Sequence, residues 1–210
     1  MPRRSPDFDL YLITDRRQTR GRELLEVVEQ ALDGGVRAVQ LREKDLAGKE
    51  LFLLAENTKS LCARYRAQFF INERIDIALA VDADGVQLGS GAIPIDAGRK
   101  LLGESKLIGA STHSIKEALA AEQAGADFIL FGPVYFTPSK AAYGKPQGLE
   151  LLKEVVEKIS LSVYAIGGVK PENIAAVKKT GARGVALISA VMSAEEPQAA
   201  SRELLRLLKA

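Results

Sequence analysis

The feature that most constrains this sequence is a short pattern that recurs along it, in which a turn is followed at once by a brief apolar stretch. Four copies stand out, with turns at residues 35–38, 83–85, 125–127 and 181–184. In three of them a glycine follows a helical pattern, where a left-handed C-cap residue belongs. Short apolar stretches of this kind are typical of buried parallel strands. The pattern therefore predicts repeated units of helix and strand.

Completing the pattern gives eight predicted strands, at residues 10–14, 38–41, 69–72, 85–88, 107–111, 128–131, 163–166 and 184–187. Amphipathic helical patterns lie between them, at residues 23–32, 49–64 and 149–159, with a shorter one at 74–80. Strand–helix alternation requires right-handed crossovers and a parallel sheet.

Two architectures fit such alternation. Eight units in 210 residues give about 26 residues per unit, near the lower size limit of a (β/α)8 barrel. The alternative is a doubly wound open sheet, but no G-x-G-x-x-G follows the first strand. The sequence has no linker and no low-complexity stretch. We therefore predict a single (β/α)8 TIM barrel, forming one domain over residues 1–210.

Composition excludes several classes of function. The 29 Lys and Arg residues nearly balance the 27 Asp and Glu residues, so we expect no nucleic-acid partner and no membrane partner. The single cysteine, Cys62, excludes an intramolecular disulfide, and the single histidine, His113, excludes a His-pair metal site. No stretch reaches the length of a membrane helix, and the basic N-terminus is not followed by an apolar segment. We expect a cytoplasmic protein.

The carboxyl ends of the strands are where a barrel of this kind places its active site. Gly167 and Gly168 follow the seventh predicted strand, and Ile188 and Ser189 follow the eighth. Glycines allow close approach of the backbone, and N–H groups at a helix start suit a phosphate monoester. The alternative is that the two glycines only form a tight turn.

A second anion site is indicated after the second predicted strand. Gln40, Arg42 and Lys44 alternate, so in an extended strand they point to one side. Two cations and an amide at the barrel mouth indicate a polyanionic ligand. A solvated charged loop is the alternative. The long loop after the sixth strand, up to about residue 146, is either a lid or an ordinary exposed loop.

At these motifs the chain resembles the thiamine-phosphate synthase family, including its thiazole tautomerase branch, over nearly its whole length. The most specific matches are residues 40–44, 71–72 and 132–135, the last followed by 137–140. Residues 109–111, 166–168 and 187–190 agree as well. The family has the (β/α)8 fold.

The resemblance implies a transferase that joins 4-amino-2-methyl-5-(diphosphooxymethyl)pyrimidine to thiazole phosphate and releases pyrophosphate. It implies that the pyrimidine diphosphate is held by Gln40, Leu41, Arg42, Glu43, Lys44, Asn72, Ser111 and Lys140. It implies that the thiazole phosphate is held by Thr137, Pro138, Ser139, Gly168, Ile188 and Ser189. Arg42, Lys44 and Lys140 are expected to act in catalysis by stabilising the leaving diphosphate together with Mg2+. We also expect a homodimer.

The family's two Mg2+ carboxylates are altered in this chain. Glu73 stands where the family usually has the first Asp, and Ala92 stands where it has the second. Mg2+ can be held by one carboxylate together with phosphates and water, so Glu73 is expected to bind the metal.

Two other functions remain open. Gln87, with the residues that follow it, resembles the tautomerase branch, but that branch uses a histidine where this chain has Pro133. Tyr135 and residues 137–140 resemble the synthase. A non-catalytic barrel that binds phosphate ligands is the third possibility. Of the three, the synthase is favoured.

Overall fold

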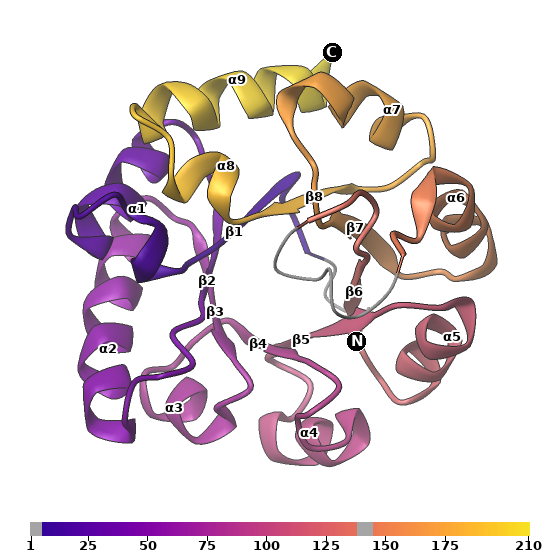
Figure 1. Cartoon of the computed structure of the whole chain (residues 1–210). Helices are drawn as coiled ribbons and strands as arrows, with labels where there is room; N and C mark the ends of the chain where they lie inside the picture. Colours follow the sequence, from indigo (N-terminus) through magenta and orange to yellow (C-terminus); the bar gives the residue numbers. More distant parts are fainter. Residues whose placement is uncertain (1–5, 138–144) are drawn as a thin grey trace.

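The computed structural model describes residues 6–137 and 145–210, and eight parallel strands close into a barrel in which β1 pairs with β8 (Figure 1). The strands are β1 (Leu10–Ile13), β2 (Ala38–Leu41), β3 (Gln68–Asn72), β4 (Gly85–Leu88), β5 (Leu107–Thr112), β6 (Phe128–Phe131), β7 (Ser162–Ile166) and β8 (Gly184–Leu187). The predicted (β/α)8 barrel is confirmed. Four strands match their predicted bounds, and β1, β3, β5 and β7 differ from them by one residue at one end.

Helices surround the barrel in chain order (Figure 1). They are α1 (Leu24–Asp33), α2 (Gly48–Arg64), α3 (Ile75–Ala80), α4 (Ile95–Leu102), α5 (Ile115–Gln123), α6 (Gly148–Lys158), α7 (Ile174–Lys178), α8 (Ser189–Met192) and α9 (Pro197–Lys209), with short 3-10 turns η1 (Arg16–Gln18) and η3 (Pro171–Asn173). The predicted left-handed glycines are confirmed, since Gly35, Gly125 and Gly181 have φ angles of 103°, 99° and 83°. No helix in the described part of the chain is long and apolar enough to cross a membrane.

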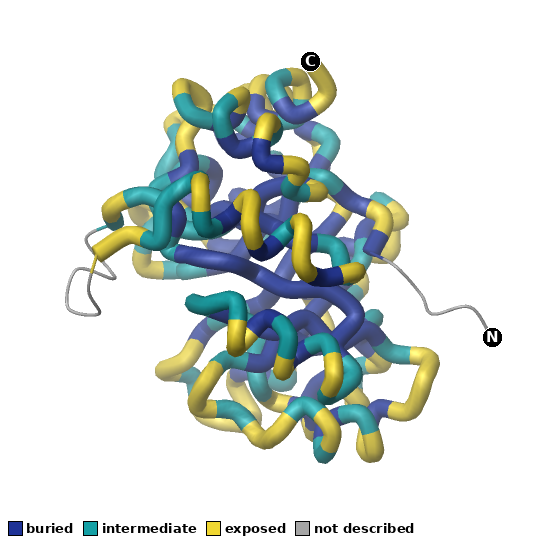
Figure 2. Tube along the Cα trace, turned by 90° about the vertical axis from the view of Figure 1, so that its right-hand side faces the viewer, coloured by how far each residue is buried: buried dark blue, intermediate teal, exposed yellow. Residues whose placement is uncertain are grey.

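Two apolar layers hold this fold together. Outward-facing strand residues such as Val39 and Leu41 pack beneath the helices, and the helices expose their outer faces (Figure 2). The inside of the barrel holds an aromatic cluster made of Phe8, Tyr11, Phe70, Phe128 and Tyr164. Within it the ring centroids of Phe8 and Tyr164 are 4.8 Å apart. Because Phe8 precedes β1 and Phe128 is the first residue of β6, these rings fill the amino-terminal end of the barrel. Only the carboxyl-terminal end then has room for a ligand.

Candidate active site at the carboxyl ends of the strands

Four polar side chains from neighbouring strands form the floor of the barrel mouth. Gln40 Nε2 donates to Asn72 Oδ1 at 3.1 Å, and Gln87 Nε2 donates to Ser111 Oγ at 3.1 Å. The two glutamines are 1% and 2% exposed, while Asn72 and Ser111 are half-buried above them. The period-2 alternation of strands turns these side chains away from the helices and into the barrel. The floor therefore carries hydrogen-bonding groups but no charge.

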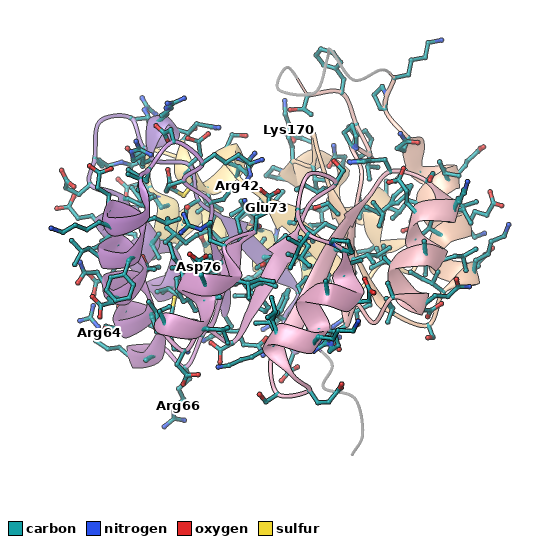
Figure 3. All side chains as sticks on the ribbon, turned by 90° about the horizontal axis from the view of Figure 1, so that it is seen from below. Arg42, Arg64, Arg66, Glu73, Asp76 and Lys170 are labelled. Carbon is teal, nitrogen blue, oxygen red and sulfur yellow. The ribbon has the colours of Figure 1, made fainter. Side chains whose placement is uncertain are left out.

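Arg42 and Lys44 lie at the rim of this floor. Because β2 ends at Leu41, both are on the loop that follows, so the strand alternation used to place them stops one residue before Arg42. Arg42, half-buried, lies on the same side of the barrel as Glu73 (Figure 3). Its guanidinium forms no hydrogen bond or ion pair with any residue that the structure describes. Lys44 Nζ lies 3.9 Å from Glu73 Oε1. The rim thus offers a cation that has no partner within residues 6–137 and 145–210.

Buried hydrogen bonds fix the backbone that carries Arg42. The Arg42 N–H donates to Thr14 Oγ at 3.0 Å, and the Thr14 hydroxyl donates to Glu43 Oε1 at 2.7 Å. The Glu43 carboxylate also accepts from the backbone N–H of Arg16 at 3.1 Å and from its guanidinium at 3.2 Å. Glu43 is 5% exposed. Its carboxylate is therefore engaged by the end of β1, and any contact of Glu43 with a ligand is left to its backbone.

Arg16 also ties down the outer part of the same loop. Its guanidinium contacts both carboxylate oxygens of Asp45, at 2.6 and 2.7 Å. This pairing lowers the pKa of Asp45 to about 2, because the cation and its hydrogen bonds favour the carboxylate. The loop after β2 is thus bound to the loop after β1 at two places, through the buried Glu43 and through Asp45 nearer the surface.

Glu73 provides the carboxylate at the mouth. Its backbone is left-handed, with φ 61°, and its N–H donates to the carbonyl of Gln87 at 3.0 Å. A non-glycine residue in this region carries strain, and such residues cluster at functional sites. Glu73 Oε1 lies 2.8 Å from the point that a Cβ on Gly89 would occupy, so the carboxylate reaches across the end of β4. The missing side chain of Gly89 makes room for it.

The donor set at this place suits Mg2+ only in part. Among the described residues no group of three or more His, Cys, Asp or Glu could hold a metal ion. Ala92 offers no oxygen, and its side chain packs against the outer core. The Glu73 side chain is 31% exposed, so a carboxylate oxygen can reach a ligand from solvent. One carboxylate fits a Mg2+ ion that takes its other oxygens from phosphate and water.

The glycines after β7 serve the chain's own packing. Gly167 and Gly168 have φ angles of 92° and 66°. A Cβ on Gly167 would lie 2.5 Å from Pro133 Cβ, and one on Gly168 would lie 2.6 Å from the carbonyl oxygen of Phe136. The predicted close approach is present, and its partner is the segment that leaves β6. The glycines therefore bring the start of the β6–α6 loop to the mouth.

The remaining predicted residues divide into four groups. Ile188 and Ser189 lie where β8 passes into α8, on the same rim as Gly168, and Ser189 is exposed. Thr137 is half-buried at the end of the first described segment. Pro138, Ser139 and Lys140 lie outside the described residues. Leu41 is buried in the outer core, so its side chain faces away from the mouth.

His113 and Cys62 contact other parts of the chain. His113 Nδ1 lies 2.5 Å from the carbonyl oxygen of Gly132, which leaves only Nε2 for another partner. Cys62 is fully buried, and burial raises the pKa of its thiol to about 12. A thiol with such a pKa is inert at neutral pH, in agreement with a packing role.

Sequence reasoning did not assign three residues of this site. In the sequence Thr14 is only a polar residue at the end of the first predicted strand, and Gln87 was noted only because it resembles the tautomerase branch. Gly89 directly follows the fourth predicted strand and was assigned no role. A useful signal was available, since polar residues in otherwise apolar strands recur at the ends of β2, β3, β4 and β5.

The fold and the mouth define a class, that of (β/α)8-barrel proteins with cationic and amide side chains at the carboxyl ends of the strands. Residues 10–191 match the family model described as thiamine monophosphate synthase, and the chain belongs to that family.

Individual proteins similar to this chain support the same family. The chain is 54% identical over 202 residues to a protein of Geobacter sulfurreducens, covering 96% of this chain and 95% of the relative. It is 44% identical over 198 residues to the thiamine-phosphate synthase of Clostridium novyi, covering 94% and 97% of the two chains. The solved thiamine phosphate pyrophosphorylase of Pyrococcus furiosus superposes with a TM-score of 0.88 at 42% identity, covering 96% of each chain.

Proposed function

We propose that this protein is a transferase that joins 4-amino-2-methyl-5-(diphosphooxymethyl)pyrimidine to thiazole phosphate and releases pyrophosphate. The observation that carries the proposal is the guanidinium of Arg42, which has no partner among the described residues. It lies directly after β2, the strand that supplies Gln40 to the polar floor, and a cation beside amide groups suits a polyanion. The relatives named above have the same activity in their names.

The proposed reaction breaks a C–O bond and forms a C–N bond. The electron pair of the C–O bond leaves with the diphosphate, and the pyrimidine methylene group becomes a cation. The ring nitrogen of the thiazole then donates its lone pair to that carbon. No proton has to be abstracted, so the enzyme's task is to orient two ligands and to stabilise an anionic leaving group.

Each rim residue receives a role in this scheme. Arg42 binds two oxygens of the diphosphate in a fork, and Lys44 adds a second positive charge. Lys140, outside the described residues, is assigned to the same anion. Glu73 would hold Mg2+, because it is the carboxylate at the mouth. When bound, the ion supplies positive charge that stabilises the departing pyrophosphate.

The second substrate is assigned to the opposite rim. The thiazole phosphate lies against the backbone of Gly168, Ile188 and Ser189, beside Thr137. Pro138 and Ser139, outside the described residues, are assigned to the same phosphate. Support comes from the close approach of the β6–α6 segment to Gly168, which brings these two stretches to one place. The two anions then bind on facing rims, so that the reacting carbon and nitrogen meet over the floor.

The test is to incubate the purified protein with both substrates and Mg2+ and to measure thiamine phosphate and pyrophosphate. We expect equal amounts of the two products, and none when either substrate is omitted. Absence of product at any Mg2+ concentration contradicts the proposal. The tautomerase is then assayed, although His113, the chain's single imidazole, has one nitrogen against the Gly132 carbonyl.

Two further expectations belong to this proposal. The protein forms a homodimer, which light scattering after size-exclusion chromatography tests. It works in the cytoplasm, where a small-molecule biosynthetic enzyme finds its substrates, and cell fractionation tests this. A monomer at micromolar concentration contradicts the first, and recovery in another fraction contradicts the second.

A further inference from the structure

The floor of the mouth contains two hydrogen bonds of the same design on adjacent strand pairs. Asn72 and Gln87 are direct neighbours across β3 and β4. In each pair a glutamine that is almost fully buried donates its NH2 group upward, Gln40 to Asn72 and Gln87 to Ser111. In each pair the amide oxygen of the glutamine is buried and has no hydrogen-bond partner. Such orphaned acceptors are rare and call for an explanation.

The orientation of the Gln87 amide follows from what surrounds it. A Cβ on Gly109 would lie 2.3 Å from Gln87 Oε1 and 2.4 Å from Phe128 Cζ, so the oxygen and the ring share the space that Gly109 leaves free. The edge of an aromatic ring carries partial positive charge, which favours the carbonyl oxygen over the NH2 group at this position. The NH2 group is then the one that faces Ser111.

This orientation decides what Ser111 can do. A hydroxyl has one proton and two lone pairs. Because Gln87 donates to Ser111 Oγ, one lone pair is occupied and the proton is directed elsewhere. In the same way Gln40 occupies Asn72 Oδ1 and leaves the Asn72 Nδ2 group to donate. Both groups that face the mouth are thereby turned into donors, which is what an anion requires.

We propose that Gln87 is a positioning residue, which fixes the Ser111 hydroxyl as a hydrogen-bond donor to the diphosphate. The inference rests on the proposed function, because it places the diphosphate above Ser111. Gln87 itself touches no ligand in this account and acts through Ser111. Its unpaired oxygen is the consequence of holding the NH2 group upward.

The test replaces Gln87 with methionine, which keeps the length of the side chain and removes both hydrogen-bonding groups. The matched control is Gln68→Met, because Gln68 also has a buried, unpaired Oε1 but opens β3 at the opposite end of the barrel. Binding of inorganic pyrophosphate with Mg2+ is measured by calorimetry, and KM is measured for each substrate. Thermal unfolding of both variants is recorded.

In Gln87→Met we expect binding of pyrophosphate and KM for the pyrimidine diphosphate to weaken about five-fold, as befits one hydrogen bond to an anion. KM for thiazole phosphate stays within about two-fold, and Gln68→Met changes neither. A structural defect would affect both substrates. Equal loss for the two, or no loss in Gln87→Met, overturns the inference.

A double-mutant cycle tests whether Gln87 acts through Ser111. Once Ser111→Ala has removed the hydroxyl, adding Gln87→Met should weaken pyrophosphate binding by less than about two-fold further. Additive losses overturn the inference. The Gln87→His variant, whose ring N–H can also donate to Ser111, should recover most of the binding, and failure to do so counts against the proposal.

The failure of this inference is distinguishable from failure of the proposed function. If the unaltered protein makes thiamine phosphate while Gln87→Met behaves like Gln68→Met, the positioning role alone is wrong. If the unaltered protein makes no thiamine phosphate, the pyrophosphate titrations still decide the role of Gln87.

Discussion

The carboxylate of Glu73 occupies the space that a side chain on Gly89 would need, with Oε1 2.8 Å from the Cβ position. The two residues end neighbouring strands, and the longer carboxylate of this chain reaches across from β3 to β4. The length of Glu73 and the absence of a side chain at position 89 are therefore matched.

We predict that Gly89→Ala displaces the Glu73 carboxylate and raises the Mg2+ concentration needed for half-maximal coupling by about ten-fold. A contact below 3 Å has to be relieved, and rotation of Glu73 is the least costly way. The Mg2+ dependence of product formation measures the effect. Gly91→Ala is the control, because a Cβ there meets nothing within 4 Å. Equal Mg2+ requirements in the two variants contradict the assignment of Glu73 to the metal.

Removing a rim cation is expected to slow the reaction. We predict that Arg42→Ala and Lys140→Ala each lower kcat/KM for coupling at least ten-fold, about 1.4 kcal/mol of transition-state stabilisation. The control is Arg64→Ala, which removes an arginine at the end of α2, toward the other end of the barrel (Figure 3). Rates near those of the unaltered protein in both rim variants show that the diphosphate binds elsewhere.

The buried link from Glu43 through Thr14 to the backbone of Arg42 gives a third prediction. Thr14→Val removes the hydroxyl that joins them and leaves the Arg42 N–H without its acceptor, so stability falls by about 1–3 kcal/mol. KM for the pyrimidine diphosphate should rise several-fold, since the rim cation loses its anchor. The control is Thr58→Val, which removes a buried threonine hydroxyl bonded within α2. Denaturant unfolding and steady-state kinetics measure the two effects. A loss of stability with unchanged KM shows that the link does not position Arg42.

The sequence was sufficient for the barrel because strands and helices alternate with a local period. Residues 38–41 are an example. Apolar residues on one face of the strand and Gln40 on the other can be assigned without information about distant residues. Strand ends could be placed within a residue, and with them the rim of the mouth.

Contacts between residues that follow neighbouring strands could not be predicted from the local pattern. Thr14 and Glu43 are 29 residues apart and meet only because β1 and β2 lie side by side. From the sequence alone, all of residues 40–44 were therefore expected to bind the ligand. In the structure the Glu43 carboxylate points toward Thr14, and the Leu41 side chain points away from the mouth. The role of Gly89 was hidden for the same reason, because it depends on the length of a side chain from another strand.

The assignment of the thiazole phosphate leads to a fourth prediction. A crystal grown with sulfate should contain an anion near the backbone N–H groups of Gly168 and Ser189, since backbone N–H groups at the start of a helix favour negative charge. Ser189→Asp, which places a negative charge at the start of α8, should abolish that density while keeping the helix, because an acidic side chain is favourable in a first helical turn. An anion found only at the amino-terminal end of the barrel contradicts the site as a whole.

The fifth prediction restores the carboxylate pair that the family usually has. Mg2+ prefers short contacts of about 2.0–2.1 Å in near-octahedral geometry and keeps several waters, so an added carboxylate in reach strengthens binding either directly or through a bound water. Glu73 is one methylene longer than Asp, and Ala92 supplies no oxygen. The double variant Glu73→Asp, Ala92→Asp should therefore lower the half-saturating Mg2+ concentration and raise the rate of coupling at low Mg2+. The single variant Glu73→Asp is the control, because without the second carboxylate a shorter side chain gains no ligand. If the double variant needs as much Mg2+ as the unaltered protein, then the metal is held without these two positions, and the role proposed for Glu73 is wrong.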